Sequence, residues 1–272
     1  MIARLIWAGA ALFVSMVSVE GRPDEVHLAP HLARYDLNLE TRGEKADLEA
    51  LNGRMVFELR GDFCTGYVYK NRTVIRLKAS DSVPVIKDQQ WEVFETKKEF
   101  RFQNKIITSD DMAQEEVGRV TKERGGLVIA LTKPEHKTFQ LRIALFPVEQ
   151  LKALIERARA GKPFYTGNLY DIAQAVDRTI PFMALIGQKQ RPKADEETKI
   201  MGKLGQESYW PISIAYFNDK QKPDGLPLYR EHFRLYDNGV VRDSVTEFDQ
   251  YSIRYTLVAF ELLPTTALSK SC

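Results

Sequence analysis

The stretch TGYVYKNRTVIRLKA, residues Thr65–Ala79, decides the fold class because apolar and charged side chains alternate along almost all of it. A period of two places successive side chains on opposite faces of a β-strand. We therefore expect a long strand with one apolar and one charged face. The apolar face carries Tyr67, Tyr69, Thr73, Ile75 and Leu77, and the charged face carries Lys70, Arg72, Arg76 and Lys78.

The same alternation recurs on both sides of this stretch and predicts a chain made mainly of strands. Short turns separate most of the runs, which favours antiparallel pairing over βαβ crossovers. The fold class is therefore mainly β and antiparallel. Further strands are expected at residues 35–40, 53–60, 85–86, 91–102, 117–122, 127–132, 139–145, 164–170, 182–188, 209–217, 228–236, 240–248 and 251–262.

The dipeptide Asn238-Gly239, between two alternating runs, is the best local turn signal. This pair is preferred in a two-residue type I′ hairpin, because both positions need a positive φ. The loop length sets a register that brings opposite charges together across the two strands, as cross-strand pairing favours. The facing pairs are Arg234 with Asp243 and Arg230 with Glu247.

Two segments depart from the alternation. Residues 148–160 place apolar side chains on one side at helical spacing and are followed by Gly161 and Pro163, so we expect one inserted amphipathic helix. Residues 188–206 contain few apolar and many charged side chains, which predicts an exposed, mobile loop. The acidic run 195–197 inside it is interpreted as solvated rather than as a cation site.

Residues 1–21 have the features of a secretory signal peptide. Arg4 provides the positive start, residues 5–19 form a short apolar run, and small residues follow at a cleavage site. The run is short for a membrane span. We therefore expect a soluble exported protein, with residues 22–272 forming a single domain.

The composition is that of a folded soluble protein. Of 272 residues, 44% are hydrophobic and 28% are charged, which is enough to build a sizeable core. The formal net charge of +2 shows no basic excess of the kind that nucleic-acid binding requires. We therefore expect no nucleic-acid partner.

The chain has two cysteines, Cys64 and Cys272. In an oxidising compartment outside the cytoplasm, two such residues are expected to form a disulfide. The bond would tie a polar C-terminal tail back to the start of the sheet. Two free thiols and an intermolecular bridge are the alternatives.

No motif indicates catalysis, a cofactor or a metal. His27 and His31 have the spacing of two helical metal ligands, but Pro30 lies between them, and only His136 and His232 remain elsewhere. The sequence contains no G-x-S-x-G elbow and no glycine-rich phosphate loop. We therefore expect a protein that is not an enzyme and carries no cofactor.

Two groups of side chains are candidates for binding. The cationic row Lys70, Arg72, Arg76 and Lys78 is suited to an anionic partner, unless Glu92, Glu95 and Glu99 on a neighbouring strand neutralise it. The aromatic residues are suited to an apolar groove for a lipid chain, unless they fill the core of a curled sheet. These aromatics include Tyr67, Tyr69, Phe94, Phe100, Phe102, Tyr251 and Tyr255.

Several longer segments resemble a known family when they are taken together, because their order and spacing match it over nearly the whole chain after the signal peptide. The segments are LYDNGVVRDSVTEFDQYSIRYTLVAFELLP (235–264), HLAPHLARYDLNL (27–39), NGRMVFELRGDFCTGY (52–67), LFPVEQLKALIERARAGK (145–162) and YWPISIAYF (209–217). They resemble the bacterial cell-envelope integrity family typified by EipB.

The resemblance implies a long antiparallel sheet coiled into a β-spiral, or incompletely closed barrel, in a periplasmic protein without known catalytic activity. It implies a scaffold or interaction protein that supports envelope integrity. The expected partner is a periplasmic envelope protein, for which a helical-repeat protein is one candidate. A likeness to the lipoprotein carriers LolA and LolB implies the alternative, a carrier that holds a lipid or lipopeptide on the concave face of the sheet.

Overall fold

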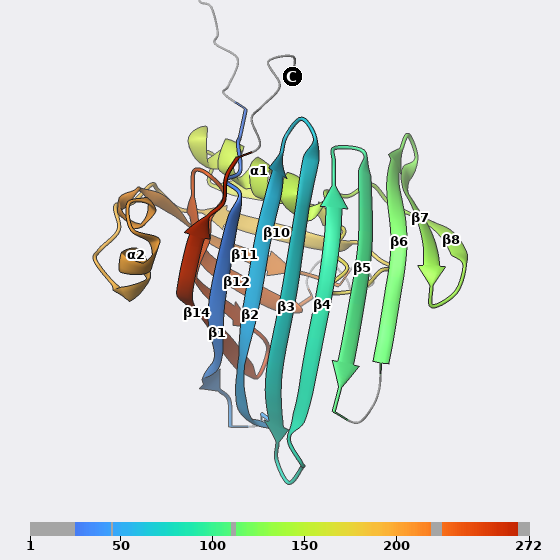
Figure 1. Ribbon diagram of the computed structural model, residues 1–272, viewed down its shortest axis with the longest axis horizontal. Helices are drawn as coiled ribbons and strands as arrows, with labels where there is room; N and C mark the ends of the chain where they lie inside the picture. The colour runs from blue at the N-terminus through green and yellow to red at the C-terminus, as the bar shows by residue number, and fades with distance from the viewer. Residues whose placement is uncertain (1–24, 45, 110–112, 219–224, 266–272) are drawn as a thin grey trace, which may run out of the picture.

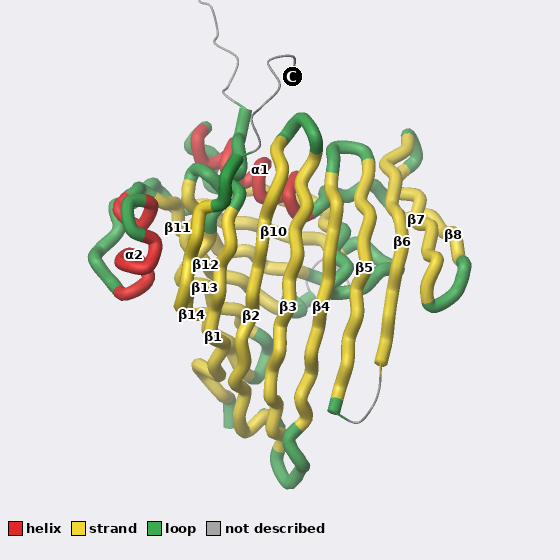
Figure 2. The backbone as a smooth tube through the Cα atoms, in the orientation of Figure 1, coloured by secondary structure: helices red, strands yellow, loops and turns green. Residues whose placement is uncertain are grey.

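The computed structural model describes residues 25–44, 46–109, 113–218 and 225–265 (Figure 1). The predicted signal peptide and Cys272 lie outside the described residues. Strands make up most of the described chain, and helices are short and few (Figure 2). None of the helices in the described ranges is long and apolar enough to cross a membrane.

The strands form one fourteen-stranded antiparallel sheet that does not close, as predicted. The strands of the first half of the chain are β1 (His31–Arg42), β2 (Leu48–Asp62), β3 (Gly66–Ala79), β4 (Val85–Glu95), β5 (Glu99–Thr108), β6 (Ala113–Glu123), β7 (Gly126–Lys133) and β8 (Lys137–Leu141). Those of the second half are β9 (Phe164–Leu169), β10 (Ile180–Ile186), β11 (Tyr209–Tyr216), β12 (Tyr229–Tyr236), β13 (Val241–Glu247) and β14 (Tyr251–Leu262).

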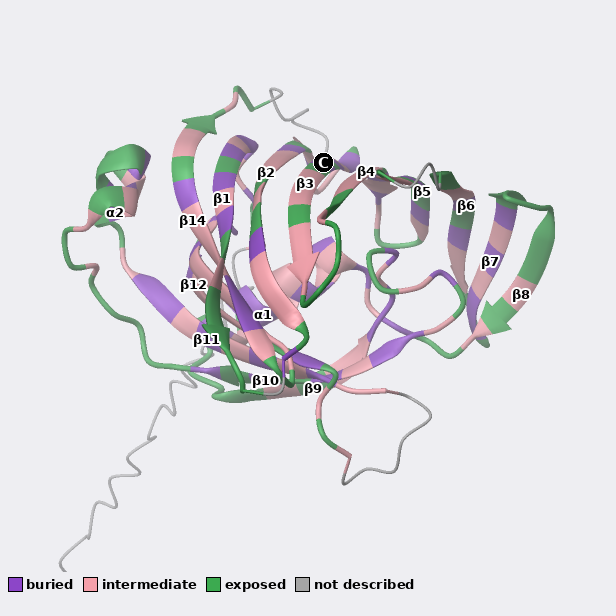
Figure 3. Ribbon diagram, turned by 90° about the horizontal axis from the view of Figure 1, so that it is seen from below, coloured by how far each residue is buried: buried purple, intermediate pink, exposed green. Residues whose placement is uncertain are grey.

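The sheet consists of two meanders joined in the middle. Strands β1 to β8 run in sequence order to one edge, strands β14 to β9 run to the other, and β1 pairs with β14 between them. The second meander lies behind the first (Figure 1). Helix α1 (Pro147–Arg159) connects the two edge strands and lies between the facing meanders (Figure 3). The predicted inserted helix is therefore confirmed.

The core lies on the side of the sheet that faces α1, which we call the inner face. It contains alternate residues of each strand, and the opposite residues form the outer face. The largest cluster of buried apolar residues includes members of both meanders and of α1, such as Phe100, Ile214 and Leu154. Curling of the sheet around one helix therefore buries the apolar stripe that the sequence shows on nearly every strand.

The predicted strand at residues 91–102 is wrong, since the chain turns inside it. Thr96 stops β4, and its hydroxyl accepts the backbone N–H of Glu99 at 3.0 Å where β5 begins. The turn sequence Thr96-Lys97-Lys98 has no glycine, proline, asparagine or aspartate. The usual composition signal of a turn is therefore missing at this hairpin.

The hairpin between β12 and β13 also differs from the prediction. Its loop has three residues, and only Gly239 has positive φ, at 82°. A bulge at Asp243, with φ of 50°, then adds one residue to β13 and cancels the shift, so Arg230 still lies opposite Glu247. Arg234 now lies opposite Arg242, although its guanidinium still reaches Asp243 at 2.7 Å.

The segment 188–206 is not a loop throughout, which corrects the prediction. After an exposed stretch, it forms helix α2 (Glu196–Met201) and a 3₁₀ turn, η1 (Leu204–Gln206). Thr198 and Met201 are buried, and Met201 joins an apolar cluster with residues of β1 and β14. Composition missed this helix because a charged buried site on the sheet, described below, binds its acidic residues.

Candidate functional site

An apolar cavity of about 260 Å³ lies between α1 and the inner face of the sheet. Its walls come from both meanders, so it exists only because the sheet curls around the helix. Its volume exceeds that of an engineered cavity of about 150 Å³ that admits benzene. The lining residues are Leu28, His31, Tyr35, Met55, Phe57, Leu59, Tyr69, Trp91, Pro147, Val148, Leu151, Gly239, Val241, Ser244 and Tyr255.

Glu95 of β4 positions the helical wall of this cavity. Its carboxylate accepts the backbone N–H groups of Val148 at 3.0 Å and Glu149 at 2.9 Å, in the first turn of α1. The hydroxyl of Tyr69 donates to the same carboxylate at 3.0 Å. The first N–H groups of a helix lack partners within it and attract negative charge, so Glu95 serves as an anchor for α1.

Burial changes the acidity of Glu95. The residue is only 2% exposed, and burial raises the pKa of its carboxyl to about 7, although the hydrogen bonds from Val148, Glu149 and Tyr69 oppose the shift. The sequence offered a signal that our prediction missed. Glu95 has the same strand parity as Trp91 and Val93, so it belongs to the apolar face and not to the charged one.

The N-terminal segment closes one end of the cavity. The backbone N–H of Ala29 donates to the carbonyl of Asn238 at 2.8 Å, which holds this segment against the β12–β13 hairpin. A Cβ on Gly239 would clash with Leu28 and lie 3.4 Å from Leu151, so only glycine leaves room for this close approach. The turn that joins two strands therefore also shapes the cavity.

His31 contributes an uncharged aromatic wall. It is 4% exposed, its ring lies 5.6 Å from that of Phe57, and burial lowers the pKa of its imidazole. His27 instead contacts Phe63, with ring centroids 4.9 Å apart. Among the described residues, no group of three or more His, Cys, Asp or Glu side chains is arranged to hold a metal ion.

The predicted aromatic groove residues are divided among several environments. Tyr69 and Tyr255 line the apolar cavity. Tyr67 lines a separate cavity of about 370 Å³ on the other side of α1, together with charged residues such as Lys152. The remaining three residues lie elsewhere: Phe100 and Phe102 are buried in the core, and Tyr251 stacks on Phe248 at 4.8 Å.

The predicted cationic row lies on the outer face and is largely neutralised. The ion pairs are Lys70 with Glu92 at 2.9 Å, Arg72 with Asp88 at 2.8 Å and Lys78 with Glu49 at 2.5 Å. Arg76 forms no ion pair with another described residue. Of the three glutamates considered as counter-charges, Glu92 takes this role, whereas Glu95 faces inward and Glu99 pairs with Arg101 and Arg119.

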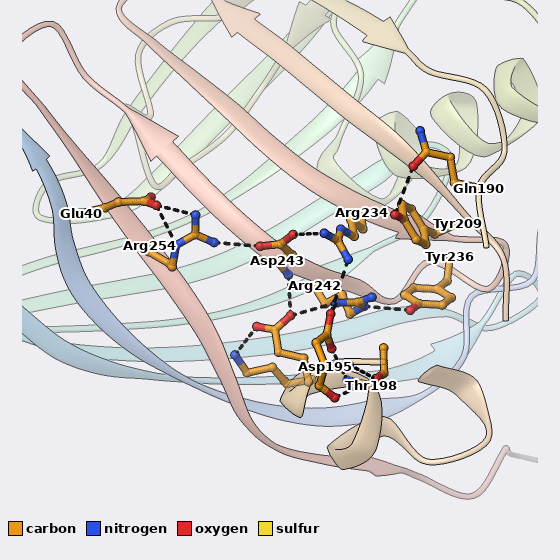
Figure 4. Close-up of polar contacts among 12 residues, drawn as sticks. Glu40, Gln190, Asp195, Thr198, Tyr209, Arg234, Tyr236, Arg242, Asp243 and Arg254 are labelled. Carbon is orange, nitrogen blue, oxygen red and sulfur yellow. Dashed lines mark hydrogen bonds and ion pairs between the residues drawn. The ribbon is translucent and has the colours of Figure 1, made fainter. Parts of the chain in front are cut away.

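Arg242 of β13 is a buried charge that the sequence did not reveal (Figure 4). Its Nε donates to the Tyr236 hydroxyl at 2.9 Å, and its Nη1 donates to Asp195 at 2.9 Å and lies 3.4 Å from Glu197. Both carboxylates belong to the segment that begins α2. The charges of this segment therefore hold it on the sheet, which explains its order despite its polar composition.

Glu197 completes a seam where the sheet splits. Strands β13 and β14 pair only over residues 244–247 and 252–255. Beyond this point, the carboxylate of Glu197 accepts the backbone N–H of Asp243 at 3.0 Å and that of Leu257 at 2.8 Å. A side chain of α2 thus satisfies one donor from each strand after the ladder between them has ended.

Cys64 lies in the turn between β2 and β3. The side chain of Asp62 accepts the backbone N–H groups of Cys64 and Thr65, both at 2.8 Å, and so fixes the turn. The predicted partner, Cys272, lies outside the described residues. The disulfide between them therefore stays a prediction.

Comparison with known proteins gives consistent results. The family model described as EipB-like matches residues 23–264. The cell envelope integrity protein EipB of Brucella abortus (strain 2308) is 37% identical over 269 residues, which cover 98% of this chain and 94% of that protein.

One solved structure has the same fold. The crystal structure of a beta-barrel-like protein of the domain of unknown function DUF1849, also from Brucella abortus, superposes with a TM-score of 0.84 at 38% identity. The match covers 88% of this chain and 100% of that one. The sequence and the fold therefore agree on one assignment, which confirms the predicted resemblance: the chain belongs to the EipB-like family.

Proposed function

We propose that this protein supports the integrity of the cell envelope from the periplasm, as a binding protein rather than an enzyme, and that it holds the apolar chain of a lipid or lipopeptide. The printed function of its relative supports the first part. The observation that carries the second part is the cavity of about 260 Å³ enclosed by α1 and aromatic and aliphatic side chains. An apolar space of this kind is typical of small-ligand sites.

Ser244 allows a direct test of the cavity. It lines the cavity from β13, whereas Ser213 of β11 lies on the outer face between two buried isoleucines of the same strand. We expect Ser244→Phe to fill the space and Ser213→Phe to leave it open. The measurement is native mass spectrometry of protein purified from the periplasm, combined with complementation of a strain that lacks the gene.

A bound lipid in the wild type and in Ser213→Phe, but not in Ser244→Phe, supports the carrier function. Complementation should follow the same order. Wild-type protein that is free of lipid, with full complementation by Ser244→Phe, contradicts it. The same periplasmic extraction tests the location, because a protein left in the cytoplasmic fraction would contradict the proposed export.

A second candidate function is a scaffold for a periplasmic envelope protein, such as a helical-repeat protein. An exposed apolar patch on the outer face near the β9 edge supports it, formed by Phe164, Met183 and Leu185, which are 62%, 46% and 46% exposed. Patches of this kind often mark interaction sites. A photo-crosslinker at position 164 should capture the partner, and Leu185→Ser should reduce the yield. No crosslink above that of a position on the β3–β4 hairpin contradicts this role.

A further inference from the structure

Two carboxylates on the inner face of the sheet have no positive partner. Glu231 of β12 lies opposite buried Ile214 and so faces inward, and Asp171 follows β9. Within the described part of the chain, neither carboxylate forms an ion pair. Their charges interact with each other, and burial raises the pKa of both, to about 7 for Glu231. Uncompensated charge of this kind is costly in a protein interior.

The surroundings of the two carboxylates are polar but uncharged. The Tyr216 hydroxyl donates to Glu231 at 3.2 Å, and the charge of Asp171 reaches both Tyr216 and Tyr229. The nearest cations of the inner side are already used, since Lys122 pairs with Glu149 and Lys152 pairs with Glu25. The protein therefore leaves a negative site on the inside of the sheet, while it neutralises charges on the outside.

Gln150 of α1 adds an independent sign of a missing ligand. It is only 6% exposed, and its side chain lies close enough to the Tyr216 hydroxyl to affect the pKa of that group. Its Nε2 nevertheless has no hydrogen-bond partner among the described residues. Buried polar groups normally have partners, so an unsatisfied amide beside the two carboxylates indicates a group that binds there.

Tyr255 connects this polar site with the apolar cavity. Its ring lines the cavity, and the charge of Glu231 raises the pKa of its hydroxyl after the larger effect of burial. Thr246, which lies opposite Glu231 on β13, also hydrogen-bonds to this tyrosine. One molecule can therefore contact both sites, with an apolar part on one side of Tyr255 and a positive part on the other.

We propose that Asp171 and Glu231 bind the ammonium head group of an amphiphile whose alkyl chain lies in the apolar cavity. The proposal rests on the carrier function above and specifies its ligand class. Charge-assisted hydrogen bonds from the ammonium satisfy the carboxylates. The free N–H of Gln150 then donates to an oxygen of the same head group.

The test compares two probes with the same chain, decylamine and 1-decanol, by their displacement of a fluorescent apolar dye from the full mature protein at pH 7. Wild-type protein should bind decylamine about tenfold more tightly than 1-decanol, as expected for one charge-assisted contact. Glu231→Gln should abolish this preference and leave 1-decanol binding unchanged. The matched control is Glu92→Gln, which removes a glutamate from the outer face and should keep the preference.

The outcomes separate the head-group site from the cavity. Equal binding of both probes by the wild type, or a preference that persists in Glu231→Gln and in Asp171→Asn, overturns the ammonium site. If 1-decanol binds in that case, the cavity function stands. If neither probe binds, both proposals fail. Circular dichroism of each variant verifies its fold, and Asp171→Asn replaces Glu231→Gln if the latter does not fold.

Discussion

Strands β3 and β4 carry charges on both faces, and the two faces treat them differently. On the outer face, Lys70 and Arg72 lie across from Glu92 and Asp88 and pair with them at 2.9 and 2.8 Å. On the inner face, the carboxylate of Glu95 has only N–H and O–H donors, from α1 and Tyr69. Charges are cheap in water and costly in a low-dielectric interior. Inner-face charges therefore identify positions that build or occupy a site.

The largest expected effect separates the two faces at adjacent residues of β5. Phe100 is fully buried, and Arg101 is exposed and pairs with Glu99. Phe100→Ala should lower the free energy of unfolding by about 3–5 kcal/mol, because it leaves a cavity in the core. Arg101→Ala should lower it by less than about 1 kcal/mol. Urea denaturation measures both, and similar losses for the two variants would break the comparison.

Arg242 tests whether a buried charge outside the inner core behaves like an interior one. Its side chain is 1% exposed, whereas that of Arg254, which pairs with Glu40 and Asp243, is 39% exposed. Arg242→Ala should cost about 3 kcal/mol, since removal of one partner from a buried ion pair leaves the other uncompensated. Arg254→Ala should cost clearly less. Limited proteolysis should then cut first near α2 in Arg242→Ala, and unchanged cleavage there would show that the ion pairs do not hold the segment.

Glu95 should make stability depend on pH near neutrality. Its folded pKa of about 7 lies above the usual value of 4.5, so the folded protein binds a proton more tightly than the unfolded chain. The associated stability is fully present below pH 4.5 and is lost as the pH rises through 7. Between pH 5 and 7.5 this loss amounts to about 2 kcal/mol.

Glu95→Gln should remove this part of the pH dependence, and urea denaturation at the two pH values measures it. Glu92→Gln on the outer face of the same strand serves as the control and should keep the wild-type slope. The assignment of the slope to Glu95 would be wrong if Glu95→Gln retained it in full. The absolute stability of Glu95→Gln should also fall, because a neutral amide anchors α1 less well than a carboxylate.

The smallest effect is expected for the outer cationic row. Lys70 is 53% exposed in its ion pair with Glu92, and such surface pairs contribute from near zero to about 1 kcal/mol. Lys70→Gln should therefore leave the free energy of unfolding almost unchanged at 0.15 M salt, a concentration at which exposed charges are screened. A loss above 2 kcal/mol would show that the outer face contributes more than surface charge pairing.

Much of the fold follows from local patterns in the chain. Alternation in residues 65–79 and its repeats predicts the strands, and helical spacing predicts α1, since each pattern states which side chains are to be buried together. The pattern fails where the local signal is weak, as at the turn Thr96–Lys98. It also fails for α2, whose acidic side chains are ordered by Arg242, a residue 45 positions away from Glu197.

The candidate site was accessible from sequence only in part. Tyr69 and Tyr255 were identified as apolar-face aromatics, and both line the cavity. Glu95 and Glu231 were not identified as inner residues, although each has the strand parity of apolar neighbours. An acidic residue at such a position is a usable signal in other sequences of this type.

By itself, the sequence determined the strand content, the inserted helix and the apolar face of most strands, because these depend on side chains that are neighbours in the chain. Only the tertiary structure decided that β1 pairs with β14, that α1 lies between the two meanders and that Glu95 anchors it. The cavity and the unpaired carboxylates arise from the same closure. The physical reason is that burial and charge compensation depend on distances in space, and the curled sheet brings together residues that lie far apart in sequence.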